Sequence, residues 1–388
     1  MKKFLSLALV AIISVSLLCG CGKETTGEVK ETVEENAATD VAENASEDEI
    51  AVETASEDLD EQYEVEPEIL WYMDEEGLKN DDMGVVIRKD NDKIQDLTLF
   101  ISVFLTKGGD VGPTGDLSAS QARLTCNYYD GTLDDYVNDE KNCVWVDDGN
   151  GGGSYEPMPK AQVGKIEYAY DHAPDSHTDT KFYIVQNGIL FNLSCEVLDP
   201  VVFLEKLQNN NFLKQYEDTN EALAYLASDG LYIPAMGICF SVEDDQMDEI
   251  LSKSVWCSRA DQEYYGDSLS IQIDDYTMYY YSDAETALDV VDNFATEEPY
   301  NDEIEYSVID DILERNIGNV TFTGRGRNDR SGFYLNDEFM LDDEADESWL
   351  FCSEDLRYVI SFSYVQGDTL SSGEEVTPDY FLSFIEEY

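Results

Sequence analysis

An internal repeat constrains this chain of 388 residues more than any other feature of its sequence. The segment Glu68–Leu78 aligns with Glu221–Leu231, and the same offset of 153 residues places Met83–Ile87 on Met236–Phe240. A repeat of this length predicts two related domains in tandem. The matched positions that carry identical residues include Leu70, Tyr72, Gly77, Leu78, Met83 and Gly84, with their partners 153 residues later.

The two copies predict the same order of elements. Gly77 and Gly230 are expected to end a short helix at the start of each copy. Strands and a middle helix follow, the helix most clearly over Ala284–Thr296. Each copy closes with the pattern Pro-x-x-Phe-Leu, beginning at Pro200 and Pro378, which indicates a last helix. Strands in one block with helices at a few points predict an α+β fold, an antiparallel sheet with helices packed on one face.

This order of elements is similar to that of the Mog1/PsbP-like domains. The shared features are a glycine before an early strand, a middle helix, a late hairpin and a closing helix. The resemblance implies that each domain, residues 67–216 and residues 217–388, is a binding or assembly module. The chain has no CxxC, GxSxG, Walker, HExxH or dinucleotide-binding motif, so no catalytic residue is assigned.

The N-terminus has the features of a secretory signal peptide over residues 1–20. Met-Lys-Lys precedes an apolar run, Phe4–Leu18, that is shorter than the roughly 20 residues needed to span a bilayer. The ending Leu18-Cys19-Gly20-Cys21 resembles the lipobox of bacterial lipoproteins. The resemblance implies cleavage before Cys21 and acylation of its thiol. Acyl chains would then anchor the protein in the lipid bilayer of the cell membrane, facing outside the cytoplasm. Ordinary secretion without a lipid is the alternative.

Acidic residues dominate the composition. The chain has 85 Asp and Glu against 23 Lys and Arg, a formal net charge of −62. Such a surface repels nucleic acid and would attract divalent cations or a basic envelope protein or peptide. Solubility is the alternative explanation for the negative charge. Residues 21–66 are especially acidic, with Lys23 and Lys30 as their basic residues and Tyr63 as their first aromatic. We expect a disordered stalk here, because the segment cannot bury enough apolar area to fold; a short helical collar is the alternative.

One loop contains both histidines of the chain. Imidazole and carboxylate groups together suit Zn²⁺, Mn²⁺ or Ni²⁺, so the loop is a candidate site for a divalent cation. Its proline, serine and aspartates also fit a solvated hairpin loop, which is the alternative. The candidate ligands are Asp171, His172, Asp175, His177 and Asp179.

Two further groups of residues are candidate ligand sites. Arg325, Arg327 and Arg330 form the densest basic cluster, and guanidinium groups bind carboxylates or phosphates. Their alternative role is pairing with neighbouring acids. Tyr279 and Tyr281 lie in an alternating aromatic strand, one face of which would present tyrosine to a peptide or glycan. Ordinary cross-strand packing is the alternative for the tyrosines.

The cysteines after Cys21 fall at positions that do not match between the two copies. Buried free thiols are therefore favoured over a disulfide framework, although one bridge per domain is left open. The sequence predicts a membrane-anchored extracytoplasmic lipoprotein that acts as a non-catalytic binding or scaffolding module. A divalent-cation-binding surface protein and an envelope hydrolase without a local motif are the alternatives. These cysteines are Cys126, Cys143, Cys195, Cys239, Cys257 and Cys352.

Overall fold

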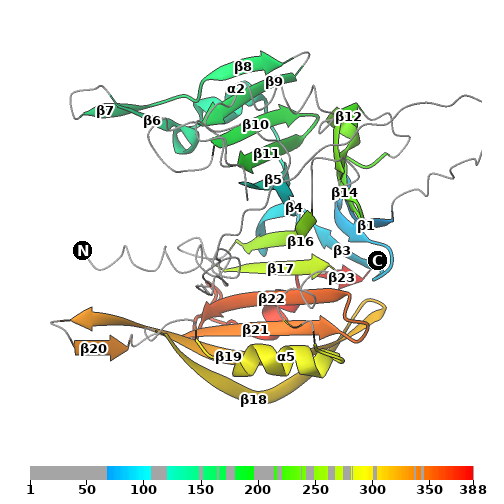
Figure 1. The fold of residues 1–388 in the computed structure, drawn as a ribbon, viewed down its shortest axis with the longest axis vertical. Coiled ribbons are helices and arrows are strands. Elements are labelled where there is room, and N and C mark those ends of the chain that lie inside the picture. Colours follow the sequence, from blue (N-terminus) through cyan, green and yellow to red (C-terminus); the bar gives the residue numbers. More distant parts are fainter. Residues whose placement is uncertain are drawn as a thin grey trace, which may run out of the picture. The chain divides into compact units, whose positions relative to one another are not determined.

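Antiparallel strands build nearly all of the described chain (Figure 1). The computed structural model describes residues 68–387 apart from 106–119, 148–151, 164–165, 172–179, 196–213, 216–220, 237, 242–248, 261–266, 274–280, 282, 300–303, 336–337 and 342–344. The elements of the first copy are β1 (Ile69–Met73), β2 (Gly77–Asn80), β3 (Val85–Arg88), β4 (Ile94–Leu105), β5 (Ser120–Tyr128), α2 (Leu133–Asn138), the 3₁₀ turn η1 (Glu140–Asn142), β6 (Val144–Asp147), β7 (Gly153–Glu156), β8 (Lys160–Val163), β9 (Ile166–Asp171), β10 (Thr180–Gln186), β11 (Ile189–Cys195) and β12 (Lys214–Gln215).

The second copy follows with β13 (Ala224–Ala227), β14 (Gly230–Ile233), the 3₁₀ turn η2 (Pro234–Met236), β15 (Ile238–Ser241), β16 (Glu249–Arg259), β17 (Ser268–Ile273), α5 (Ala287–Thr296), β18 (Ile304–Ile317), β19 (Val320–Leu335), β20 (Glu338–Leu341), β21 (Asp346–Ser353), β22 (Tyr358–Val365), α6 (Pro378–Leu382) and β23 (Glu386–Glu387). At the offset of 153 residues, β2 and β3 fall on β14 and β15. The repeat of the sequence is therefore a repeat of strands.

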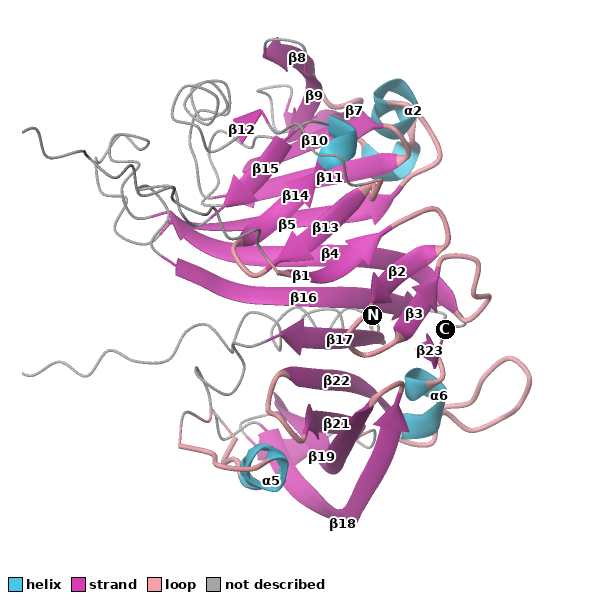
Figure 2. Ribbon diagram, turned by 90° about the vertical axis from the view of Figure 1, so that its right-hand side faces the viewer, coloured by secondary structure: helices cyan, strands magenta, loops and turns pink. Residues whose placement is uncertain are grey.

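Both copies contribute to the same two sheets. The larger sheet has the order β18-β19-β21-β22-β17-β16-β4-β5-β11-β10-β9-β8, and β20 extends from β19. The smaller sheet has the order β12-β15-β14-β13-β1-β2-β3-β23. Figure 2 shows the strands of both sheets. The copies meet at β4–β16 in the larger sheet and at β1–β13 in the smaller one, where Tyr72 lies opposite its own repeat equivalent, Tyr225.

The last short strand of each copy pairs with the other copy. Lys214 of β12 lies opposite Cys239 of β15, in the second copy. Glu386 of β23 lies opposite Val86 of β3, in the first copy. Val86 precedes Cys239 by 153 residues, so the two exchanged strands occupy equivalent places.

The prediction of an α+β fold is wrong. Strands make up 60% of the structure and helices 12%, so the chain is a mostly β protein of large antiparallel sheets. The helices expected before Gly77 and Gly230 are strands, and these glycines begin β2 and β14. A Cβ on Gly77 would lie 2.1 Å from the carbonyl oxygen of Ile87 on the neighbouring strand. Gly77 thus allows close contact between strands and does not cap a helix.

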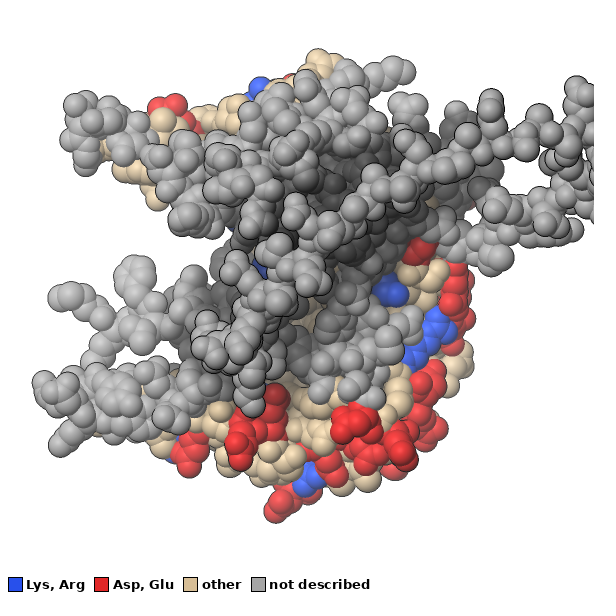
Figure 3. Space-filling view, viewed as in Figure 1, with Lys and Arg blue, Asp and Glu red and all other residues tan. Residues whose placement is uncertain are grey.

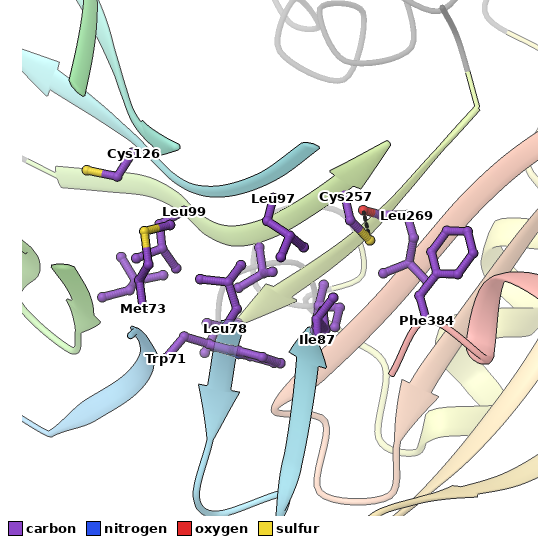
Figure 4. Close-up of a cluster of buried hydrophobic side chains, with 14 of the residues drawn as sticks. Trp71, Met73, Leu78, Ile87, Leu97, Leu99, Cys126, Cys257, Leu269 and Phe384 are labelled. Carbon is purple, nitrogen blue, oxygen red and sulfur yellow. Dashed lines mark hydrogen bonds between the residues drawn. The ribbon is translucent and has the colours of Figure 1, made fainter. Parts of the chain in front are cut away.

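The main hydrophobic core is shared by the two sheets. Trp71, Met73 and Leu78 come from the smaller sheet and are fully buried. They meet apolar side chains from the larger sheet, including Leu99 and Cys257 (Figure 4). Alternate residues of the central strands of the larger sheet belong to this core, so the residues between them point to the opposite face of that sheet.

Residues 67–388 form one compact unit, distinct from residues 1–66. The expected boundary between residues 216 and 217 lies outside the described residues, as do Cys21 and the stalk at residues 21–66. Among the helices described, none has the length and apolar character needed to span a membrane. Within the described part of the chain, the cysteines seen as free thiols are Cys126, Cys143, Cys257 and Cys352.

Candidate binding surface

The arginine cluster of β19 holds α5 against the larger sheet. Arg325 forms an ion pair with Asp292 of α5. Arg327 donates to the carbonyl oxygen of Phe294 at 2.9 Å and to the carboxylate of Asp329 at 2.9 Å. Its guanidinium carbon also lies 3.9 Å from the ring centroid of Tyr306. These arginines therefore pair with neighbouring acids and with the C-terminal end of the helix.

The ion pair with Arg327 compensates a buried carboxyl group, that of Asp329. Its side chain is buried, and burial raises the pKa of the Asp329 carboxyl, while the nearby Arg327 and the hydroxyl of Ser348 oppose the rise. The third arginine of the cluster, Arg330, is exposed and lies opposite Glu305 of β18. The guanidinium groups of Arg325 and Arg327 are therefore already bonded to other residues of this protein.

The predicted tyrosine pair and cation site are only partly described. Tyr281 is 8% exposed and packs in the cluster beneath α5 with Val290 and Phe294, whereas Tyr279 lies outside the described residues. Asp171 ends β9 opposite Lys181. Within the described ranges no group of His, Cys, Asp and Glu is arranged to hold a metal ion. The other candidate ligands, His172, Asp175, His177 and Asp179, lie outside the described residues.

A separate hairpin, β6–β7, carries the most exposed aromatic side chains of the described chain (Figure 1). Trp145 is 55% exposed and Tyr155 is 71% exposed. They lie directly opposite each other, and their ring centroids are 5.2 Å apart in an edge-to-face arrangement. At the base of the hairpin, Val144 packs against the buried cluster of α2 that includes Met158. The aromatic pair therefore projects from an anchored base.

Gly153 fixes the position of the indole. A Cβ on Gly153 would lie 2.6 Å from the Trp145 ring and 2.4 Å from the carbonyl oxygen of Val146. The ring therefore rests against the backbone of β7, where any larger residue would displace it. This contact leaves the outer face of the indole available and restricts its conformations before a partner binds.

The charges around the hairpin favour a cationic partner. Lys141 pairs with Asp139 at 3.5 Å, and Lys160 pairs with Asp134 at 2.5 Å. The positive charges of Lys141 and Lys160 are therefore already paired with carboxylates. Glu156 is exposed and accepts a hydrogen bond from the hydroxyl of Ser154 at 3.0 Å. Figure 3 shows that acidic side chains outnumber basic ones on the described surface of the face it presents.

The sequence did not single out Trp145 or Tyr155. The available signal was their placement on either side of the glycine-rich turn after Asp147, which is typical of a hairpin with paired aromatics. No protein-family model matches the chain, and no curated protein matches it either. The case for its function therefore depends on its own residues.

Proposed function

We propose that this protein is a membrane-anchored extracytoplasmic lipoprotein that acts as a non-catalytic binding or scaffolding module at the cell envelope. The β6–β7 hairpin is its contact surface, and a basic segment of an envelope protein or peptide is its partner. The observation that carries the binding role is the exposed pair Trp145 and Tyr155 on an anchored hairpin. Tyrosine and tryptophan are enriched where proteins bind one another.

The N-terminal sequence supports the place of action. The signal peptide of residues 1–20 and the lipobox-like ending at Cys21 fit acylation and export. Acyl chains on one cysteine give stable attachment to a bilayer. The large negative charge of the chain disfavours an anionic partner and favours a cationic one.

Fractionation tests the anchor. The wild-type protein should be found in the membrane fraction and be labelled by a radioactive fatty acid. Cys21→Ala should lose the label. If Cys21→Ala is labelled as strongly as the wild type, or if the wild type carries no label, the lipoprotein assignment is wrong.

Site-specific photo-cross-linking in cells tests the contact surface. A photoreactive amino acid at Trp145 or Tyr155 should give discrete adducts with another protein. The matched control is Met340 of β20, which is 44% exposed on another part of the molecule and should give none of these adducts. Glu156→Lys should weaken the adducts, because it reverses a charge beside the aromatic pair. Equal adducts from Met340 and Trp145 would contradict the proposal.

A further inference from the structure

The larger sheet has a second face that the hairpin does not involve. On β16, β17 and β22, the residues between the core positions point away from the core. Serine recurs among them. We call this face of the larger sheet, opposite the core, the serine face, and its serines on these three strands are Ser252, Ser254, Ser258, Ser268, Ser270, Ser361 and Ser363.

One row of the serine face crosses five strands from both copies. Trp256 lies opposite Thr98 on one side and Ser270 on the other. Thr98 in turn lies opposite Asn127, and Ser270 opposite Ser361. The row therefore runs over β5, β4, β16, β17 and β22, which succeed one another in Figure 1. At a strand spacing of about 4.8 Å it extends over roughly 19 Å.

The row contains no charged residue, which is unusual in a chain with 85 acidic residues. The nearest carboxylate on β4, Asp96, accepts a hydrogen bond from Ser258 at 3.2 Å. Trp256 stands in the middle of the row and is 41% exposed. The row thus combines one exposed indole with hydroxyl and amide groups.

Its polar groups are only partly bonded to one another. The side chain of Asn127 donates a hydrogen bond to the hydroxyl of Thr98. The hydroxyl of Ser270, beside Trp256, has no hydrogen-bond partner in the described structure. Asn192 lies opposite Thr125 on the same face, and its amide oxygen is also without a partner. Buried polar atoms of this kind are few in native proteins and call for an explanation.

From this chemistry we infer that the serine face binds a neutral glycan chain along the row. The apolar side of a sugar ring would stack on the indole of Trp256. Its hydroxyl groups would bond to the side chains of Asn127 and Ser361, which stand at the two ends of the row. A polyanion would require cations in the row, and a basic peptide would require carboxylates. An apolar partner would require more than one large apolar side chain.

Isothermal titration calorimetry on the full-length protein in detergent tests this inference. The probes are chitotetraose and cellotetraose, which are extended, and maltotetraose, which is curved. We expect saturable binding of at least one extended tetrasaccharide. Trp256→Ala should weaken that binding by at least about tenfold. Ser361→Asp, which adds a charge to the row, should weaken it too.

The control is Trp145→Ala, which removes the aromatic side chain of the hairpin and should leave glycan binding unchanged. Circular dichroism and the melting temperature establish that each variant is folded. The inference is overturned if no tetrasaccharide binds the wild type, if folded Trp256→Ala and Ser361→Asp bind as the wild type does, or if Trp145→Ala abolishes binding. It is independent of the protein-binding role of the hairpin, because photo-cross-linking from Trp145 does not depend on Trp256.

Discussion

Replacing Arg327 with alanine tests how α5 is held against the larger sheet. The change removes the cation beside Asp329, whose side chain is 8% exposed, and empties the space between the rings of Phe294 and Tyr306. Removing one member of a buried ion pair costs about 3–5 kcal/mol, because the other charge stays buried without compensation. We expect the free energy of unfolding to fall by about that amount, and Tm to fall by about 4–7 °C for a unit of this size.

The loss of stability in Arg327→Ala should become smaller as pH falls. Burial already raises the pKa of Asp329 in the folded protein, and loss of the Arg327 cation would raise it further. A carboxyl whose folded-state pKa is raised destabilises the fold when it is ionised. The deficit of Arg327→Ala should therefore be complete above the folded-state pKa and shrink as pH falls toward about 3.9, the pKa of an unfolded aspartate.

Urea unfolding at pH 7 and pH 5 measures both effects. The matched control is Arg315→Ala, since the Arg315–Asp379 pair is largely exposed and should contribute about 1 kcal/mol or less. Adding Asp329→Asn to Arg327→Ala should restore part of the stability, because the buried charge is then gone. The reasoning is refuted if Arg327→Ala costs no more than Arg315→Ala, or if its deficit grows on acidification.

Three further outcomes follow from the described contacts. Gly153→Val should displace the indole of Trp145 and reduce cross-linking from the hairpin, whereas equal cross-linking would contradict the close contact seen there. In the native protein at pH 8, iodoacetamide should modify Cys143 and spare Cys352, because burial raises the pKa of the Cys352 thiol to about 12; mass spectrometry would reveal the opposite order if this is wrong. Replacing Asp310–Asp311 with serines should increase self-association in analytical ultracentrifugation, since charges and a bulge protect the edge strand β18; an unchanged monomer fraction would count against that role.

The sequence revealed the repeat, but it did not reveal whether the first elements of each copy are helices or strands. Identical residues at a fixed offset mark β2 and its repeat β14, but the sequence predicted no strand at either place. Their neighbours, β1 and β13, are short apolar runs, and such a run does not distinguish a buried strand from a helix. Gly77 was therefore interpreted as a helix cap, although the structure uses it for contact between strands.

Helix α5 shows a similar limit at the level of side chains. The expected helix over Ala284–Thr296 is confirmed as α5, with Thr286 as its N-cap. Within this helix Leu288 is 42% exposed, whereas Val290 is fully buried. The spacing of apolar residues predicts that a helix exists, but packing on β19 and β21 decides which side faces inward.

The two candidate surfaces were hidden from the sequence for different reasons. Trp145 and Tyr155 are separated by the hairpin turn, and the sequence does not reveal that both are exposed. The row centred on Trp256 comes from five strands spread between Thr98 and Ser361, and only the register of the larger sheet brings them into line. Local patterns cannot specify such long-range pairing.

The exchange of β12 and β23 between the copies is the arrangement of a homodimer with swapped arms. In such a dimer equivalent surfaces meet about a twofold axis, as β1 and β13 do where Tyr72 faces Tyr225. Here the two halves belong to one polypeptide, so they are always present in equal amounts. The two halves also need not be identical in one polypeptide: the first contains the β6–β7 hairpin, and the second contains the long strands β18 and β19.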